Sequence, residues 1–93
     1  MREREVESAL VKAVRKRHGM ALKFVCPGLD GVPDRIVLLP NGKLAFIELK
    51  RPGGKMRKLQ EKRKAQFEAL GFLVFCVNDI DEIGGILDGI QAS

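Results

Sequence analysis

Three charged side chains interrupt segments of the chain that are otherwise almost entirely apolar. Asp34 is followed by thirteen residues, 35–47, and then by Glu48 and Lys50, which are two positions apart. Two carboxylates held within a few ångströms repel one another unless a cation lies between them, and such oxygen ligands suit Mg²⁺ or Mn²⁺. A nearby ammonium would orient an attacking water and stabilise charge on a phosphoryl group. If the three side chains converge, they can hydrolyse a phosphodiester.

Convergence depends on the turn that joins the two strands carrying these residues. If Asn41 and Gly42 form a two-residue turn, Asp34 and Glu48 point to opposite faces of the sheet. If residues 40–42 form a three-residue loop, Asp34 lies opposite Glu48 and the carboxylates share a face.

Pro40 favours the three-residue loop. Its fixed φ suits the first central position of a type I turn, and it has no N–H to close a two-residue loop. In that turn Asn41 is the second central residue, Gly42 is left-handed in a bulge, and Leu39 pairs with Lys43. Side chains alternate along a strand, so Lys50 joins the face of Glu48.

Apolar periodicity and breaking residues predict the remaining elements. In chain order we expect a helix over 2–18, strands over 20–26, 34–39 and 44–50, a helix over 56–70, a strand over 72–77 and a helix over 80–90. The later strands are apolar at nearly every position, so both sheet faces should be covered by helices. The fold class is α/β.

Each expected helix carries an apolar stripe. The stripes are Val6, Leu10, Ala13 and Val14; Met56, Leu59, Phe67 and Leu70; and Ile80, Ile83, Leu87 and Ile90. Gly19 and Gly71 should end the first two helices, and His18 should be a cation near the first helix's C-terminus. The last helix contains three glycines, which weaken it, so it must rely on tertiary or partner contacts.

Composition limits the chain to one small domain, residues 1–93. It has 17 Lys+Arg against 12 Asp+Glu, a net charge of +5, and 45% hydrophobic residues. That content supports one modest core and excludes a disordered tail. The sequence contains no membrane-span-length apolar run and no signal h-region, so we expect a cytoplasmic protein.

The cysteines do not indicate a zinc site. Cys26 and Cys76 are far apart, no CxxC occurs, and His18 is the only histidine. The usual zinc ligands are therefore missing, and both cysteines are expected to be buried, reduced thiols.

The sequence around the charged residues resembles a known nuclease family. Segments 31–40 (GVPDRIVLLP), 46–50 (FIELK) and 59–60 (LQ) are similar to the small stand-alone VRR-NUC nucleases of phages, in the PD-(D/E)XK superfamily. The similarity covers roughly residues 3–78. It implies a restriction-endonuclease-like α-β-β-β-α-β core, a mixed sheet flanked by helices, Mg²⁺ or Mn²⁺ as cofactor, and DNA cleavage.

Carried over position by position, the resemblance assigns roles to individual residues. Asp34, Glu48 and the carbonyl of Leu49 would hold the metal, and Lys50 would be the catalytic lysine. Gln60 matches the glutamine that supports the lysine or a phosphate.

The family also places a glutamate of the first helix beside the site. Glu3 and Glu7 both border the stripe of that helix, whereas Glu5 points away. Glu7 is favoured, with Glu3 as the second choice.

Basic residues suggest where DNA would lie. Residues 51–64 contain seven basic side chains and one acid, directly after the strand of Glu48. The candidates for phosphate contacts are Lys23, Arg35, Arg51, Lys55, Arg57 and Lys58, and such contacts make affinity depend on salt. With no Trp, no Tyr and no groove-reading motif, we expect recognition of DNA shape rather than of bases. No nucleotide cofactor is expected.

The acidic C-terminal segment should face away from DNA. From residue 79 onwards the chain has four acids and no base, and its last helix favours a symmetric homodimer. The family's resemblance to junction resolvases suggests two sites that cut two strands of branched DNA, such as a four-way (Holliday) junction. The alternatives are a non-catalytic DNA-binding or interaction module, and a general double-strand nuclease or nickase without branch preference.

Overall fold

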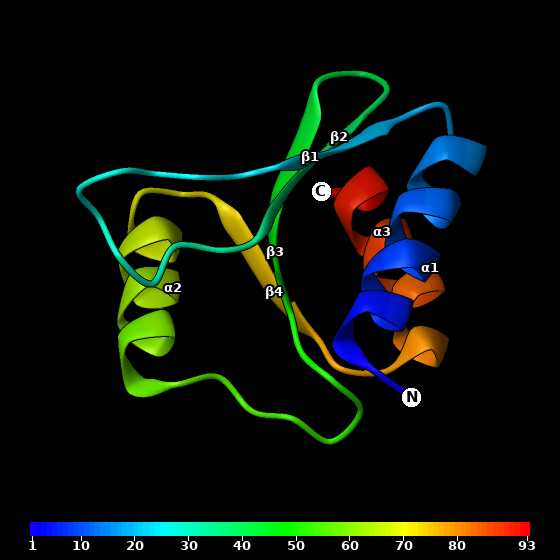
Figure 1. Cartoon of the computed structure of the whole chain (residues 1–93). Helices are drawn as coiled ribbons and strands as arrows, with labels where there is room; N and C mark the ends of the chain where they lie inside the picture. Colours follow the sequence, from blue (N-terminus) through cyan, green and yellow to red (C-terminus); the bar gives the residue numbers. More distant parts are fainter.

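All seven expected helices and strands are present in the computed structural model, which describes residues 1–93 (Figure 1). In chain order they are α1 (Glu3–Lys16), β1 (Met20–Lys23), β2 (Arg35–Leu39), β3 (Lys43–Leu49), α2 (Lys58–Ala69), β4 (Leu73–Val77) and α3 (Ile83–Ala92). A short 3₁₀ turn, η1 (Ile80–Glu82), precedes α3. None of the helices is long and apolar enough to cross a membrane.

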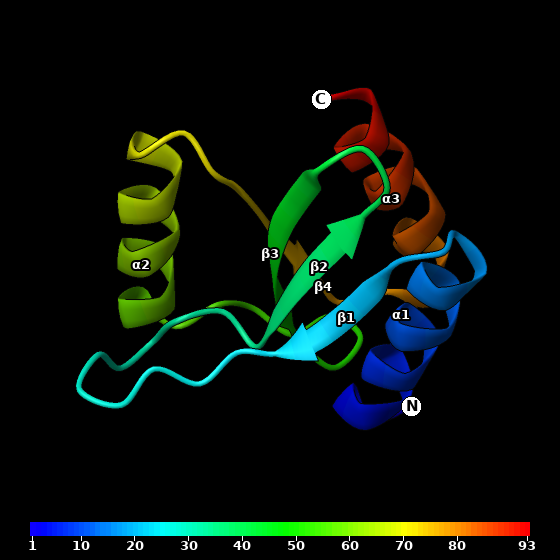
Figure 2. The same cartoon turned by 90° about the horizontal axis from the view of Figure 1, so that it is seen from above.

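The four strands form one mixed sheet in the order β1-β2-β3-β4. The first three are antiparallel neighbours, while β4 runs parallel to β3 and is reached through α2, because parallel strands require such a crossover. Helices α1 and α3 lie together on one side of the sheet, and α2 stands on the other (Figure 2). The expected α/β class, a mixed sheet flanked by helices, is confirmed.

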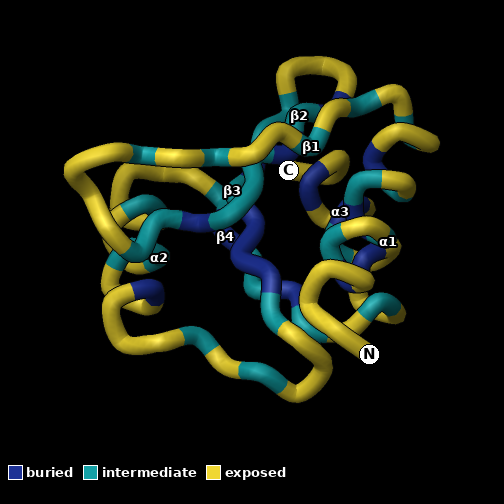
Figure 3. Tube along the Cα trace, viewed as in Figure 1, coloured by how far each residue is buried: buried dark blue, intermediate teal, exposed yellow.

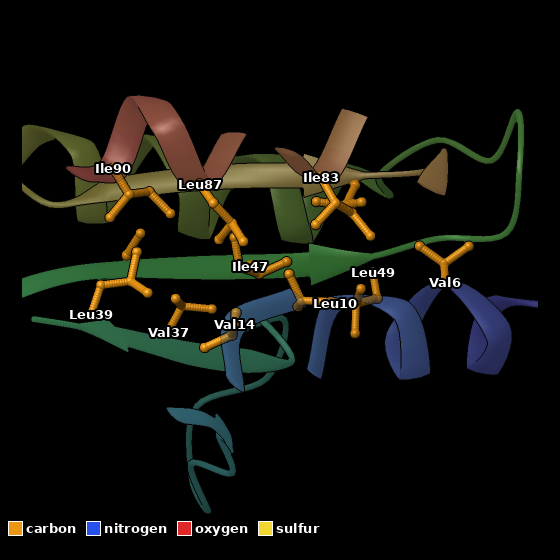
Figure 4. Packing of buried hydrophobic residues seen from close by; sticks show 12 residues of the cluster. Val6, Leu10, Val14, Val37, Leu39, Ile47, Leu49, Ile83, Leu87 and Ile90 are labelled. Carbon is orange, nitrogen blue, oxygen red and sulfur yellow. The ribbon is translucent and has the colours of Figure 1, made fainter. Parts of the chain in front are cut away.

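The hydrophobic core lies between the sheet and the α1–α3 pair (Figure 4). The helices contribute residues at three- to four-residue spacing, and the strands contribute alternate residues, as their geometry requires. The cluster consists of Val6, Leu10, Val14, Val37, Leu39, Ala45, Ile47, Leu49, Val77, Ile83, Leu87 and Ile90. The stripe of α3 is therefore buried within the monomer.

Helix α2 lies on the opposite side of the sheet, as expected, but covers it only partly. Leu59 and Leu70 of the predicted α2 stripe are 42% and 76% exposed, and Gln60 is the only buried residue of α2. Figure 3 shows most of α2 in the colours of exposed and intermediate residues. Phe67 provides the main contact, with ring centroids 4.8 Å from Phe46 and 6.4 Å from Phe24. These aromatic contacts link α2 to β3 and to the segment after β1.

The β2–β3 register is the one that the three-residue loop predicted. Leu39 pairs with Lys43, which confirms the register. The turn type was wrong: Asn41 has a φ of 69° beside Gly42 at 73°, whereas a type I turn needs a negative φ at Asn41. Asparagine tolerates the left-handed region, so the loop keeps its length with another backbone conformation.

The two helix ends that were expected at glycines differ in detail. Gly71, at a φ of 93°, ends α2 as expected. At α1 the left-handed residue is His18, whose N–H donates to Arg15, while the N–H of Gly19 donates to Val14. Gly19 is needed for space instead, because a Cβ there would lie 2.4 Å from the carbonyl oxygen of Leu38.

Both cysteines are free, as expected, but neither is fully buried. Cys26 lies in the connection after β1, which ends at Lys23 rather than at residue 26. Cys76 lies on the side of the sheet that α2 only partly covers, so the predicted burial was wrong at both positions.

Candidate active site

The open end of the β2–β3 hairpin brings Asp34 and Glu48 together. The N–H of Asp34 donates to the carbonyl of Ile47 at 3.0 Å, and Arg35 pairs with Ile47. One residue further along the same register, Asp34 lies opposite Glu48. Oδ2 of Asp34 accepts the N–H of Leu49 at 2.8 Å, which fixes the carboxylate against β3.

Glu48 is a buried carboxyl with one unpartnered oxygen. The residue is 1% exposed, and its Oε2 has no hydrogen-bond partner. Burial, a hydrogen bond with Asp34 and the charge of Asp34 raise the pKa of Glu48 to about 8, with a further contribution from Glu3, while the charge of Lys50 opposes the shift. A buried polar atom left unpaired is costly, so this oxygen is a position that a cation would stabilise.

Lys50 follows directly after β3 and is held there by its backbone. Its N–H donates to the carbonyl of Val77 at 2.9 Å. Its side chain lines a hollow of about 440 Å³, called here the lysine hollow. The residues of this hollow are Met1, Arg2, Glu3, Lys50, Arg51, Gly54 and Lys55.

A second hollow, of about 260 Å³, lies beside Asp34 and is called here the carboxylate hollow. Its residues are Glu3, Glu7, Lys23, Phe24, Val25, Asp34 and Leu49. The carboxylate hollow thus adjoins the candidate metal ligands Asp34 and Leu49, and the lysine hollow adjoins Lys50. Glu3 lines both of them.

The two α1 glutamates are placed differently. Oε2 of Glu7 is paired with Nε of Arg35 at 2.9 Å. Glu3 has no ion pair, and it is Glu3 rather than Glu7 whose charge contributes to the raised pKa of Glu48. The geometry therefore favours Glu3 as the helix carboxylate of the site, where the sequence reading preferred Glu7.

Gln60 occupies a buried position at the start of α2. It is 6% exposed, and its Oε1 accepts the N–H of Arg57 at 2.9 Å. It has no hydrogen bond to Lys50. In this arrangement its carbonyl holds the first turn of α2, and its amide nitrogen donates no hydrogen bond within the protein.

Most of the candidate phosphate contacts are free of ion pairs. Lys23 lines the carboxylate hollow, Arg51 and Lys55 line the lysine hollow, and Arg57 and Lys58 are exposed at the start of α2.

Arg35 is the exception among these candidates. It is engaged by Glu7 and by the carbonyl of Ala21, and its side chain is 14% exposed. The guanidinium of Arg35 therefore already has partners within the protein, unlike the charged groups of the other candidates.

Sequence reasoning missed one neighbour of the site. Cys76 on β4 pairs with Glu48, and burial, followed by the charge of Glu48, raises the pKa of its thiol. Only the parallel register of β3 and β4 reveals this neighbour, and that register has no local sequence signal.

The donor set fits a hard divalent cation. Nowhere do three or more His, Cys, Asp or Glu side chains gather to hold a metal ion. Asp34 and Glu48 would therefore be joined by the carbonyl of Leu49 and by water or phosphate oxygens. Mg²⁺ retains several waters and is held by one or two carboxylates, so the residues present fit this ion or Mn²⁺. The unpartnered Oε2 of Glu48 is the structural observation behind this fit.

The α/β fold and the paired carboxylates are consistent with the class of restriction-endonuclease-like nucleases, and comparisons with known proteins give the family. A scan against models of known families finds no match. The chain is 47% identical, over 91 residues, to the protein named "Putative nuclease p44" of Acyrthosiphon pisum secondary endosymbiont phage 1, covering 98% of this chain and 97% of that one. A solved structure of a VRR-NUC domain superposes with a TM-score of 0.86 at 25% identity, covering 92% of this chain and 94% of that one. The chain belongs to the VRR-NUC nucleases.

Proposed function

We propose that this nuclease is a metal-dependent DNA endonuclease whose cofactor is Mg²⁺ or Mn²⁺. Asp34, Glu48 and the carbonyl of Leu49 would hold the ion. The observation that carries the proposal is the buried, unpartnered carboxylate oxygen of Glu48 facing a second carboxylate. A protein that only binds DNA gains nothing from two carboxylates directed at phosphates.

Each residue of the site has a distinct task in this mechanism. When bound, the divalent ion supplies Lewis-acid polarisation of a phosphoryl oxygen and a lowered pKa for coordinated water. The N–H of Leu49 keeps the carboxylate of Asp34 in place. Lys50 orients the attacking water and stabilises the negative charge that develops on the phosphoryl group. Glu3 adds negative charge at the junction of the two hollows and strengthens attraction for the cation.

The surrounding basic side chains would hold the DNA backbone. Arg51 and Lys55 line the lysine hollow with Lys50, and Lys23 lines the carboxylate hollow with Asp34, so they form a positive rim beside the site. Arg57 and Lys58, exposed at the start of α2, would extend this rim along the DNA. Gln60 is proposed to offer its free amide to the same backbone. These contacts carry no base information, so selectivity would follow DNA shape, with four-way junctions as the preferred substrate.

A homodimer is proposed through the open side of the sheet rather than through α3, whose stripe is buried. Met20 and Leu22 of β1, and Phe72 before β4, are 57%, 40% and 46% exposed. A second copy would cover this apolar surface, and a two-fold axis would present two sites to two strands. We expect the enzyme to act in the cytoplasm.

Cleavage of labelled DNA tests the catalytic proposal. The substrates are linear duplex, single strand, flap and four-way junction, each with Mg²⁺, Mn²⁺ or chelator. Wild type should cut the junction fastest and only with a divalent ion, and Lys50→Ala should abolish cutting. Lys16→Ala, at the far end of α1, is the matched control and should behave as wild type.

The other outcomes identify the alternatives. Equal cutting of linear and branched DNA would indicate a general nuclease or nickase. Binding without cutting under every metal condition would indicate a non-catalytic module. Equal rates for wild type and Lys50→Ala would remove Lys50 from the mechanism.

Sedimentation tests the homodimer. Wild type should sediment as a dimer at micromolar concentration, and Leu22→Asp should sediment as a monomer. A monomeric wild type would refute the dimer, and a dimeric Leu22→Asp would place the interface elsewhere.

A further inference from the structure

Arg35 follows Asp34 in the sequence, yet its side chain lies on the other side of the sheet. Because side chains alternate along a strand, Asp34 faces Glu48 while Arg35 faces α1. Its Nε is 2.9 Å from Oε2 of Glu7, and its Nη1 donates to the carbonyl of Ala21 at 2.8 Å. One guanidinium thus joins α1, β1 and β2 immediately beside a candidate metal ligand.

The contact with Glu7 affects the position of Glu3. The two glutamates are four residues apart and therefore lie one above the other on the same face of α1. Both line the carboxylate hollow, but only Glu3 also reaches the lysine hollow. The contact of Glu7 with Arg35 therefore anchors the face of α1 that carries Glu3, in addition to the burial of Val6 in the core.

The chemistry of Arg35 suits this task. Its rigid guanidinium contacts a carboxylate and a carbonyl at the same time, which a lysine ammonium on a flexible stem does less well. The pair is also largely shielded, with side-chain exposures of 14% for Arg35 and 30% for Glu7. A shielded pair is less weakened by salt than a surface pair.

We infer that Arg35 is a positioning residue that acts through Glu7 to hold Glu3 beside the metal-binding carboxylates. The inference rests on the proposed metal site. It gives Glu7 a supporting role instead of a catalytic one, and it assigns Arg35 to the architecture of the site instead of to DNA contact.

A double-mutant cycle on Mn²⁺ affinity, measured by calorimetry without DNA, tests the inference. Glu3→Gln and Arg35→Met should each weaken binding about tenfold, the lower end of the effect of outer-shell partners on metal affinity. The double variant should bind Mn²⁺ no more weakly than either single variant. In Arg35→Met the side chain of Glu3 is already displaced from the site, so its removal should cost no further affinity. Additive losses, which give about a hundredfold in the double variant, would overturn the inference.

Two further variants guard against a purely structural effect. Glu7→Gln is a milder change that removes the same ion pair. Its effect on Mn²⁺ affinity, like that of Arg35→Met, should not add to the effect of Glu3→Gln. If the two effects on affinity add, the inference is contradicted. Arg17→Met is the matched control, because Arg17 ties the other end of α1 to Asp88 of α3 at 2.8 Å. It should lower the melting temperature while leaving Mn²⁺ affinity unchanged, and an equal loss of affinity would make Arg35 a general stabilising residue.

Glu48→Gln separates failure of this inference from failure of the proposed function. If that variant loses Mn²⁺ binding while the Arg35 cycle is additive, the metal site stands and the positioning role falls. If Glu48→Gln binds Mn²⁺ like wild type, the metal site and the inference fall together.

Discussion

The two sides of the sheet carry the same kinds of apolar strand residues but are used differently. Beneath α1 and α3, Val37 and Ile47 are fully buried, whereas their neighbours Ile36 and Phe46, on the other side, are only half-buried beside α2. All twelve residues of the main core belong to the packed side or to the helices that cover it. The open side carries Glu48, whose buried oxygen has no partner.

This difference shows how so small a domain accommodates a costly site. An uncompensated buried carboxylate destabilises the fold, and such cost is tolerated at functional sites when the rest of the structure offsets it. The packed side provides that stability, and the open side keeps the carboxylates accessible to a cation and to DNA. Substitutions on the two sides should therefore have opposite signatures, with stability lost on one and activity lost on the other.

The largest effect is expected for Asp34→Asn on the open side. Loss of one carboxylate should lower the cleavage rate by about 10³-fold. The fold should persist, because asparagine keeps an oxygen that can accept the N–H of Leu49. Gel shifts in chelator should show DNA binding retained or tightened, since a negative charge is removed. Cleavage within tenfold of wild type would contradict the assignment.

The next effect is expected on the packed side. Leu87 is completely buried, so Leu87→Ala should lower the free energy of unfolding by about 2–5 kcal/mol. Leu70→Ala on α2, where the leucine is 76% exposed, is the matched control and should change it by less than about 0.5 kcal/mol. Urea unfolding measures both, and similar losses would abolish the distinction between the two sides.

A pH dependence should identify Glu48 in the metal-free protein. Its pKa in the folded state, about 8, lies above the ordinary value for an unfolded chain. Its stabilising contribution is therefore complete at acid pH and is lost as the pH rises towards 8. Glu48→Gln should remove this loss, so that at pH 9 in chelator it is more stable than wild type by about 1–3 kcal/mol.

Thermal unfolding at pH 5 and pH 9 measures this difference. Glu61→Gln, an exposed change on α2, should retain the wild-type dependence. If the stability difference between wild type and Glu48→Gln is the same at pH 5 and pH 9, the raised pKa of Glu48 is contradicted.

The smallest effect concerns the basic rim. Lys55→Ala and Lys58→Ala should each reduce the slope of log affinity against log salt by about 1, because each removes one phosphate contact. Binding is measured in chelator to prevent cleavage, with Lys12→Ala on α1 as the control. An unchanged slope for Lys55→Ala would show that DNA does not pass the lysine hollow, and an unchanged slope for Lys58→Ala would show that it does not pass the start of α2.

Local chemistry in the sequence was sufficient for the hairpin that builds the site. Pro40 disfavours the two-residue turn, and the strand period then places Asp34 opposite Glu48, as the register confirms. The turn conformation was not predictable from Pro40, because Asn41 can adopt either sign of φ.

Other features depended on contacts between distant segments. The stripe of α2 looks like a core stripe, yet Leu59 and Leu70 are exposed, and Phe67 is the stripe residue that meets Phe46 of the sheet. Helical spacing could not separate Glu3 from Glu7, since both lie on one face of α1. The pairing partner of Glu7 in three dimensions distinguishes them, and no local pattern encodes that partner.

The central claim, that Asp34 and Glu48 converge on one divalent cation, is tested most directly by Mn²⁺-induced broadening of amide signals in NMR spectra. At low Mn²⁺ the amides around Asp34 and Glu48 should broaden first, and Glu48→Gln should abolish that pattern. Broadening centred instead on the acidic residues Asp79 and Asp81, or a pattern that survives in Glu48→Gln, would contradict the claim.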